Sequence, residues 1–313
     1  MTDNTQNTSI ILCTRNRIEA PLCFLRSLGC QTELPQELII IDSSDIPLNN
    51  DSGLQRQMLE LQMNMSVKYV HSDPGLTKQR NIGVKSAQGD ILYFFDDDIV
   101  LEPNYLENMN KAFLEHPECI GGMGTLLKIK RPTLRDRPML FVRHLFLQQT
   151  DYGDGKFYQS GFARHFFSED QFANVKVLSG AIMAFRKEVF DQFLFDEKLH
   201  DYCFMEDVDI SKRVSDKYLL FHNPLAKADH RHADGGRGDI FQNRKMYMFN
   251  HRYLFMKNYY PNNRFALIPH IWSIIGLSLL SYVPYRKNIS HVTLRGYLAG
   301  LYEFGKRKTD MLK

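Results

Sequence analysis

The chain has 313 residues, of which 43% are hydrophobic and 24% charged, an ordinary balance for a folded soluble protein of one large or two small domains. Its formal net charge of +3 is too small to indicate a nucleic-acid partner. The five cysteines are odd in number and scattered, which argues against a disulfide framework and a zinc site and favours a reducing compartment. The polar first residues carry no secretory signal, so we expect a cytoplasmic protein.

Buried strand patterns alternate with helical patterns in the amino-terminal part of the chain. Strands are expected at residues 9–13, 38–41 and, more weakly, 67–70, and the clearest early helix at residues 18–28. This alternation predicts a mostly parallel sheet flanked by helices, a Rossmann-like α/β fold.

Polar side chains follow the expected strands at the points where the strands end. Thr14 and Asn16 follow the first strand, and Asp42 follows the second. Each loop by itself fits ordinary turn chemistry. Because the carboxyl ends of parallel strands meet at one edge of a sheet, their convergence favours a nucleotide pocket.

A short apolar and aromatic run at residues 91–95 ends in three carboxylates, Asp96, Asp97 and Asp98. The run is too short for a helix and fits a fully buried strand of a parallel sheet. Adjacent carboxylates repel one another and are stable together where a cation meets them. Two or three oxygen ligands at one point suit Mg²⁺ or Mn²⁺. The alternative is an acidic turn that water solvates.

Helical patterns flank the acidic run on both sides. Residues 76–86 form the first, and Arg80 near its start is suited to a forked grip on phosphate, with a solvated basic face as the alternative. The second opens at Pro103 and runs to about residue 116.

The second half of the chain is less regular. Residues 128–170 show poor periodicity, and we interpret them as a variable insertion that could close over an acceptor. A strand-like stretch at residues 175–186 contains Ser179 and Gly180, where backbone can approach a ligand closely. A helix is expected at residues 187–193 and a last short strand at residues 219–221.

These motifs together resemble the family 2 glycosyltransferases of the GT-A fold. The resemblance rests on the order and spacing of CTRNR, IDSSD, GLTKQRNIGVKSAQGD and FFDDDIVLEPNYLE, and it covers about residues 9–260. Such enzymes transfer a sugar from a nucleotide diphosphate donor with inversion at the anomeric carbon. The resemblance implies a nucleotide-sugar-binding half at residues 8–125, an acceptor-binding and catalytic half at residues 126–240, and a helical extension at residues 241–313.

The resemblance also assigns expected contacts to the donor and the metal. Thr14, Asn16 and Asp42 would border the nucleobase. Arg80 would face the nucleotide. Asp96 would meet the ribose and Asp98 a Mn²⁺ or Mg²⁺ ion. Since the acidic triplet can be shifted by one residue, Asp97 remains an alternative ribose contact and Asp96 an alternative metal ligand.

An acidic pair further along the chain, Glu206 and Asp207, matches the pair that carries the catalytic base in this family. Inverting transfer needs one carboxylate to take the proton of the acceptor hydroxyl, on the face opposite the leaving diphosphate. We expect Asp207 to be that base and Glu206 to position it. A plain acidic helix start is the alternative, because the helix dipole favours it, and Asp209 is assigned to pairing with Arg213 four residues on.

Two histidines and an arginine follow the last expected strand. In similar enzymes a histidine at this place often joins the metal or the diphosphate. His230 and His232 are both candidates, with His230 preferred, and either could instead be structural. Arg237 could neutralise the leaving diphosphate.

The most apolar stretch lies at residues 265–283 and borders on the length of a membrane span. Pro269 and His270 interrupt it, and its polar residues share one face, so we expect an amphipathic helix that lies on a membrane surface or packs on the catalytic domain. A true span is the less favoured alternative.

The sequence therefore predicts an inverting glycosyltransferase that uses a nucleotide diphosphate sugar, UDP-sugar in the first instance. The expected acceptor is a glycan, or a lipid-linked glycan at the inner face of the cytoplasmic membrane, where the enzyme would be peripheral. Two alternatives are a metal-dependent phosphotransferase or nucleotidyltransferase, and a non-catalytic sugar- or lipid-binding module on the same fold.

Overall fold

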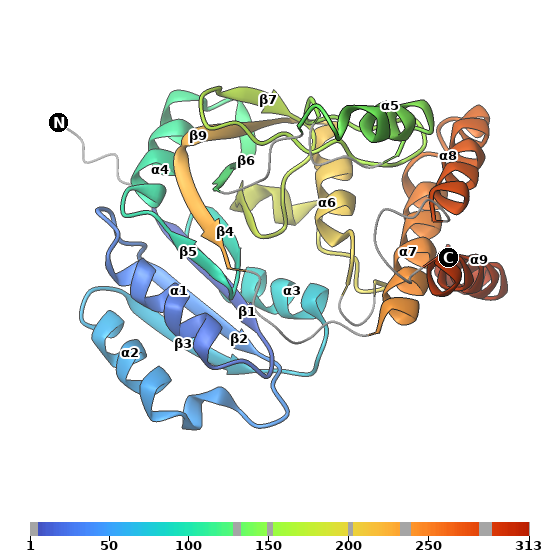
Figure 1. Ribbon diagram of the computed structural model, residues 1–313. Coiled ribbons are helices and arrows are strands. Elements are labelled where there is room, and N and C mark those ends of the chain that lie inside the picture. Colours follow the sequence, from blue (N-terminus) through green and yellow to red (C-terminus); the bar gives the residue numbers. More distant parts are fainter. Residues whose placement is uncertain are drawn as a thin grey trace.

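The computed structural model describes residues 6–127, 133–148, 153–199, 203–231, 239–281 and 290–312. Their strands form one nine-stranded sheet in the order β3-β2-β1-β4-β8-β6-β9-β5, with β7 pairing with β9 outside this path (Figure 1). The strands are β1 (Thr8–Thr14), β2 (Glu37–Asp42), β3 (Ser66–His71), β4 (Ile91–Asp96), β5 (Ile99–Leu101), β6 (Cys119–Leu126), β7 (Ala173–Val175), β8 (Ile182–Arg186) and β9 (Leu219–His230).

Helices connect these strands and continue beyond them at the carboxyl end. They are α1 (Glu19–Gly29), α2 (Ser52–Gln62), α3 (Leu76–Ser86), α4 (Tyr105–Glu115), α5 (Arg137–Leu145), α6 (Glu206–Ser215), α7 (Ile240–Asn258), α8 (Leu267–Leu280) and α9 (Ser290–Met311). Figure 1 shows α7, α8 and α9 grouped at the end of the molecule away from α2. Within the described ranges, no helix combines the length and the apolar character needed to cross a membrane.

The predicted parallel half of the sheet is present. β1 pairs in parallel with β2 and β4, and β2 pairs in parallel with β3. The crossover from β3 to β4 passes through α3, which packs on β1 and β2. The carboxyl ends of β1, β2 and β4 therefore lie at one edge of the sheet, as the polar loops after them predicted.

Strand direction changes at β4, and this change positions the pocket. β8 runs antiparallel to β4, so its amino-terminal end reaches the edge at which β4 ends. The backbone N–H of Asp96 donates to the carbonyl oxygen of Ala181 at 3.2 Å. The loop before β8, with Ser179 and Gly180, is thereby held next to the acidic triplet.

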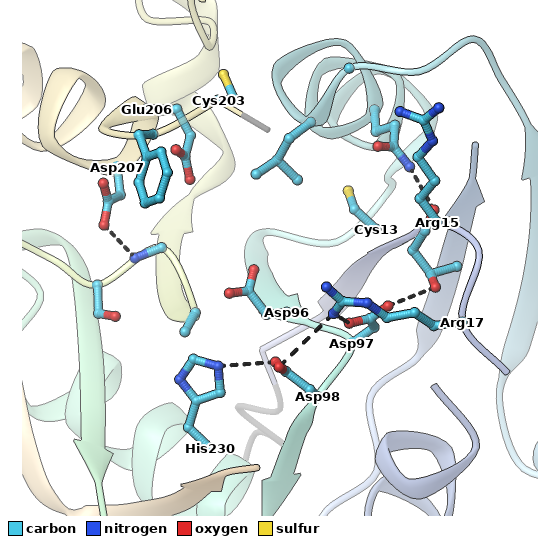
Figure 2. A pocket seen from close by; sticks show the side chains of 18 of the residues that line it. Cys13, Arg15, Arg17, Asp96, Asp97, Asp98, Cys203, Glu206, Asp207 and His230 are labelled. Carbon is cyan, nitrogen blue, oxygen red and sulfur yellow. Dashed lines mark hydrogen bonds and ion pairs between the residues drawn. The ribbon is translucent and has the colours of Figure 1, made fainter. Parts of the chain in front are cut away.

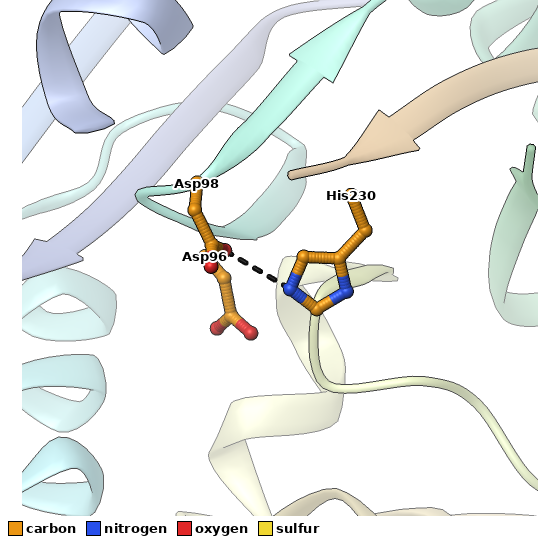
Figure 3. Close-up of side chains that lie close together, drawn as sticks. All are labelled: Asp96, Asp98 and His230. Carbon is orange, nitrogen blue, oxygen red and sulfur yellow. Dashed lines mark ion pairs between the residues drawn. The ribbon is translucent and has the colours of Figure 1, made fainter. Parts of the chain in front are cut away.

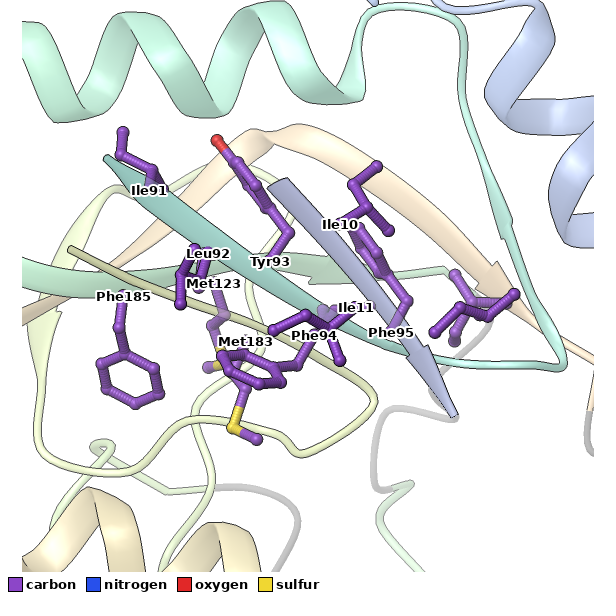
Figure 4. Packing of buried hydrophobic residues seen from close by; sticks show 14 of the residues in the cluster. Ile10, Ile11, Ile91, Leu92, Tyr93, Phe94, Phe95, Met123, Met183 and Phe185 are labelled. Atoms are coloured by element: carbon purple, nitrogen blue, oxygen red, sulfur yellow. The ribbon is translucent and has the colours of Figure 1, made fainter. Parts of the chain in front are cut away.

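β4 lies at the centre of the core, as its apolar run predicted. Its residues from Ile91 to Phe95 are buried on both faces of the sheet (Figure 4). Phe94 packs against Phe190 and Phe195, and Phe95 against Phe24 and Tyr105, with ring centroids 5.2 to 5.5 Å apart. A strand packed on both faces has little freedom to shift, so the carboxylates at its end are fixed in place.

Four expectations about the second half were incomplete or wrong. The expected helix at residues 187–193 is a 3₁₀ helix, Lys187–Asp191. Of the strand-like stretch at residues 175–186, only residue 175, the end of β7, and residues 182–186, which form β8, are in strands, and residues 176–181 connect them. The insertion at residues 128–170 includes α5. The expected short strand at residues 219–221 continues to His230 as β9, because its first part pairs with β6 and β7 and its last part pairs with β6 and β5.

Candidate active site

A pocket of about 580 Å³ opens at the edge where β1 and β4 end (Figure 2), within the range typical of small-molecule sites. Its walls come from segments far apart in the sequence. They are the loop after β1, the start of α3, the turn after β4, the loop before β8, the start of α6 and the end of β9. Asp98, predicted as a metal ligand, and Asp207, predicted as the base, both line this pocket.

Asp96, Asp98 and His230 form a cluster on one wall of the pocket (Figure 3). One potential ligand atom from each lies within 4.8 Å of the others, and Asp98 Oδ1 is 3.0 Å from His230 Nε2. The side chain of Asp96 is 37% exposed. Two carboxylates and one imidazole fit a divalent cation.

Strand pairing, rather than sequence proximity, brings His230 to this cluster. β5 begins directly after the acidic triplet and runs antiparallel to the end of β9, with Ile99 opposite His230. The backbone N–H of Arg231 also donates to the carbonyl oxygen of Asp98 at 3.0 Å. The histidine is therefore held beside Asp98 by backbone bonds on both sides of it.

Asp97 is directed away from the cluster and is held by the loop after β1. Its carboxylate accepts hydrogen bonds from the Thr14 hydroxyl at 2.8 Å and from the Arg17 guanidinium at 3.0 Å. Burial raises the pKa of Asp97 to about 6, although Arg17 and the Thr14 hydrogen bond lower it. No role was predicted for Arg17 from the sequence. Its position in CTRNR, three residues after Thr14, is the feature that could have indicated that it belongs to the site.

Asp207 lies across the pocket from the cluster, at the start of α6 (Figure 2). Its carboxylate accepts the backbone N–H of Gly180 at 2.9 Å and that of Val208 at 2.8 Å. The residues before it adopt left-handed backbone conformations, with φ of 54° at Cys203 and 77° at Met205. Non-glycine residues in this region are strained, and such strain gathers at functional sites.

Glu206 is buried beside Asp207 and paired with Arg80. The Arg80 guanidinium donates to Glu206 Oε1 at 2.8 Å, to the carbonyl oxygen of Gly180 at 2.8 Å and to Asp96 Oδ1 at 3.3 Å. Burial raises the pKa of Glu206 to about 8, with Arg80 lowering it and Asp207 raising it further. Arg80, which is 2% exposed, thus joins the two acidic groups from behind the pocket wall.

Two other predicted donor contacts hold loops together in this structure. Asp42 does not line the pocket, and its carboxylate accepts from the backbone N–H groups of Ser44 and Leu48 and from the Tyr69 hydroxyl. Asn16 does line it, and exchanges hydrogen bonds with Asp45 in the loop after β2. Their expected contacts with a nucleobase stay predictions.

The family model for glycosyl transferase family 2 matches residues 9–194. The chain belongs to this family. An uncharacterized glycosyltransferase of Bacillus subtilis, YwdF, is 26% identical over 244 residues, which cover 77% of this chain and 81% of the relative. An uncharacterized glycosyltransferase of Haemophilus influenzae is 30% identical over 119 residues, which cover 35% of this chain and 38% of the relative.

Solved structures share the fold of this family 2 glycosyltransferase at low sequence identity. GalNAc-T7 with UDP, GalNAc and Mn²⁺ is similar over 98% of this chain, with a TM-score of 0.59 and 14% identity, and the chain spans 58% of that structure's length. The mannosyltransferase PcManGT from Pyrobaculum calidifontis, in complex with GDP-Man and Mn²⁺, is similar over 96% of this chain and 88% of its own, with a TM-score of 0.57 and 15% identity. The predicted GT-A fold is confirmed.

The remaining predicted residues of the glycosyltransferase divide into two groups. His232 and Arg237 lie outside the described residues. Asp209 forms the expected pair with Arg213 at 2.7 Å and also binds Lys257 of α7 at 2.9 Å. It therefore joins α6 to α7.

Proposed function

We propose that this glycosyltransferase transfers a sugar from a nucleotide diphosphate sugar to a hydroxyl of a glycan acceptor, with inversion and with a divalent metal. The observation that carries the proposal is the pairing of two acidic groups across one pocket, with Asp96, Asp98 and His230 on one wall and Asp207 on the other. A single displacement needs both a metal site and a separate carboxylate, because a metal-bound oxygen is a poor base for the acceptor proton.

The residues have separate roles in the proposed reaction. Asp98, His230 and Asp96 would hold Mn²⁺ or Mg²⁺, which when bound supplies positive charge that stabilises the leaving diphosphate. Asp207 takes the proton of the acceptor hydroxyl on its carboxylate. The two backbone N–H groups that bind this carboxylate keep it oriented.

The donor class is supported by the shape and charge of the pocket. Arg15 and Arg17 line it beside the loop after β1, where cationic side chains suit phosphate. The two solved structures with the same fold contain UDP or GDP-Man together with Mn²⁺. A UDP-sugar is our first choice, and Thr14, Asn16 and Asp97, which line the pocket, are the contacts that we expect for its ribose and base.

A panel of nucleotide sugars with and without Mn²⁺ tests the donor assignment. Binding to the native state raises the thermal midpoint by mass action, so we expect at least one nucleotide diphosphate sugar to raise it only when the metal is present. Free nucleotide monophosphates and sugars are the controls. A panel in which no nucleotide diphosphate gives a metal-dependent rise would contradict the proposal, and turnover independent of the sugar would favour the phosphotransferase alternative.

A further inference from the structure

The helix α8 carries its apolar side chains on the outside of the protein. Its fully buried residues are small or polar, namely His270, Ser273 and Gly276. Its outer side chains are 42% to 69% exposed and fall on one face at 100° per residue: Ile268, Ile271, Trp272, Ile275 and Leu279. This is the reverse of the polarity of a surface helix in water, which buries its apolar face.

The apolar surface continues from α8 onto α5. The Trp272 ring lies 4.8 Å from the Phe146 ring, and Trp272 Nε1 donates to the carbonyl oxygen of Leu145 at 2.8 Å. α5 has no buried residue, and Phe141 and Leu145, four residues apart, are both exposed on it. Figure 1 shows α5 and α8 next to each other at the end of the molecule away from α2. We call the exposed side of these two helices the α5–α8 face.

The elements around this face are strongly basic. Residues 133–148, 239–281 and 290–312 contain twelve Lys and Arg residues and four Asp and Glu residues, a net charge of +8, whereas the whole chain has +3. α8 itself contains no charged residue. Arg137 of α5 and Arg264 just before α8 are exposed, and Arg137 lies on the same side of α5 as Phe141 at 100° per residue.

We propose that the α5–α8 face docks on an anionic lipid surface. The apolar side chains would enter the boundary between headgroups and acyl chains, and the bordering arginines would contact lipid phosphates. The charge also argues against a second copy of this chain as the occupant, because two copies meeting through this face would bring like charges together. The proposal goes beyond the transfer reaction and does not depend on the donor or the acceptor.

Sedimentation of the full chain with lipid vesicles tests this proposal. We expect binding to vesicles that contain phosphatidylglycerol, weaker binding at high salt because exposed charges are screened, and little binding to neutral phosphatidylcholine vesicles. The double variant Ile271→Glu and Ile275→Glu should weaken binding at least about tenfold, since it removes two apolar side chains from the membrane.

A matched control is available on α2. Leu59 and Met63 are also exposed apolar residues four positions apart, and the double variant Leu59→Glu and Met63→Glu should bind vesicles as the wild type does. Unchanged thermal midpoints and unchanged donor-induced shifts would show that both variants remain folded. Equal binding to neutral and anionic vesicles, or equal loss in both double variants, would overturn the proposal. The proposal would also be overturned if the wild type formed a dimer that did not bind vesicles, while the Ile271→Glu and Ile275→Glu variant was a monomer.

Discussion

Arg80 is the side chain that connects the two acidic walls of the pocket. It is buried and donates to Glu206, to Asp96 and to the carbonyl oxygen of Gly180. Without Arg80 these buried acceptor groups lose their hydrogen-bond donor, so we expect Arg80→Met to lower the free energy of unfolding by about 1–3 kcal/mol. Urea denaturation measures this change.

The control for this variant is Arg56→Met. Arg56 forms an exposed pair with Glu60 at 3.0 Å on α2, and the loss of such a pair changes the free energy of unfolding by less than about 1 kcal/mol. Equal effects of the two variants would mean that the buried hydrogen bonds of Arg80 do not stabilise the fold.

Gly180 allows the carboxylate of Asp207, the proposed base, to approach the loop before β8. A Cβ atom added there would lie 3.0 Å from Glu206 Oε1 and 3.1 Å from Asp207 Cβ. We expect Gly180→Ala to displace Asp207 and slow transfer by about tenfold or more, since small misplacements of reacting groups are costly, while the donor-induced thermal shift is retained. Kinetic assays at saturating donor measure the loss.

Gly305 provides the comparison for that substitution. No heavy atom lies within 4 Å of a Cβ added at Gly305 of α9, and alanine is favoured over glycine in a helix by about 1 kcal/mol. Gly305→Ala should therefore leave transfer unchanged and raise the thermal midpoint. Full transfer activity in Gly180→Ala would mean that the close approach at Gly180 is not needed to hold the base.

At the level of elements, α7 and α8 meet through two buried histidines. His251 of α7 stacks on Phe162 and lies 4.9 Å from the ring of His270 of α8, which stacks on Phe255. Burial lowers the pKa of His270 to about 4, and it lowers the pKa of His251 well below its usual value. Both rings are therefore neutral in the folded protein at neutral pH.

The sign of the resulting pH dependence follows from proton binding. In the unfolded chain these histidines have a pKa near 6.5, so between that value and about 4 the unfolded state binds more protons. Their contribution is complete above about pH 6.5 and is lost as the pH falls toward 4. We expect the difference in free energy of unfolding between the wild type and His270→Gln to shrink from about pH 7 to about pH 5.

Urea denaturation of both proteins across this range provides the measurement. The carboxyl groups with raised pKa act in the opposite direction, and they are common to both proteins, so the difference isolates the histidine. A difference that stays constant with pH would show that His270 does not titrate on unfolding.

Local pattern was sufficient for the elements whose burial is encoded in a run of their own residues. The helix at residues 76–86 was predicted with the bounds of α3, and the buried run at residues 91–95 is β4. β9 was predicted too short because its length depends on pairing with β5, β6 and β7, which no local pattern encodes. α5 was missed because it buries no residue and so has no apolar face toward a core.

The candidate site also combines residues that the sequence could indicate with contacts that depend on the fold. Asp98, His230 and Asp207 were chosen from the resemblance to family 2 glycosyltransferases, with which their chemistry agrees, and they line one pocket. The Arg80–Glu206 pair joins residues 126 positions apart, and only the fold could bring them together. Arg80 was expected to face the nucleotide, whereas its guanidinium is engaged with protein groups.

At the level of the whole molecule, one continuous sheet joins the two expected halves of the catalytic domain. β4 of the first half pairs with β8 of the second, and β5 pairs with β9. The change of strand direction at β4 therefore brings the loop before β8 and the end of β9 to the edge where the parallel strands end. The side chains that could bind a metal and the separate carboxylate share a pocket because the sheet places both at the same edge.

A side-by-side measurement of Asp98→Asn and Asp207→Asn tests this shared pocket most directly. For each variant, the Mn²⁺-dependent rise in thermal midpoint with donor and the rate of sugar transfer are measured on the same preparation. We predict that Asp98→Asn loses both, whereas Asp207→Asn keeps the rise and loses transfer by about 10²–10⁴-fold, the usual contribution of a general base. Full transfer activity in Asp207→Asn, or loss of the rise in both variants alike, would contradict the account.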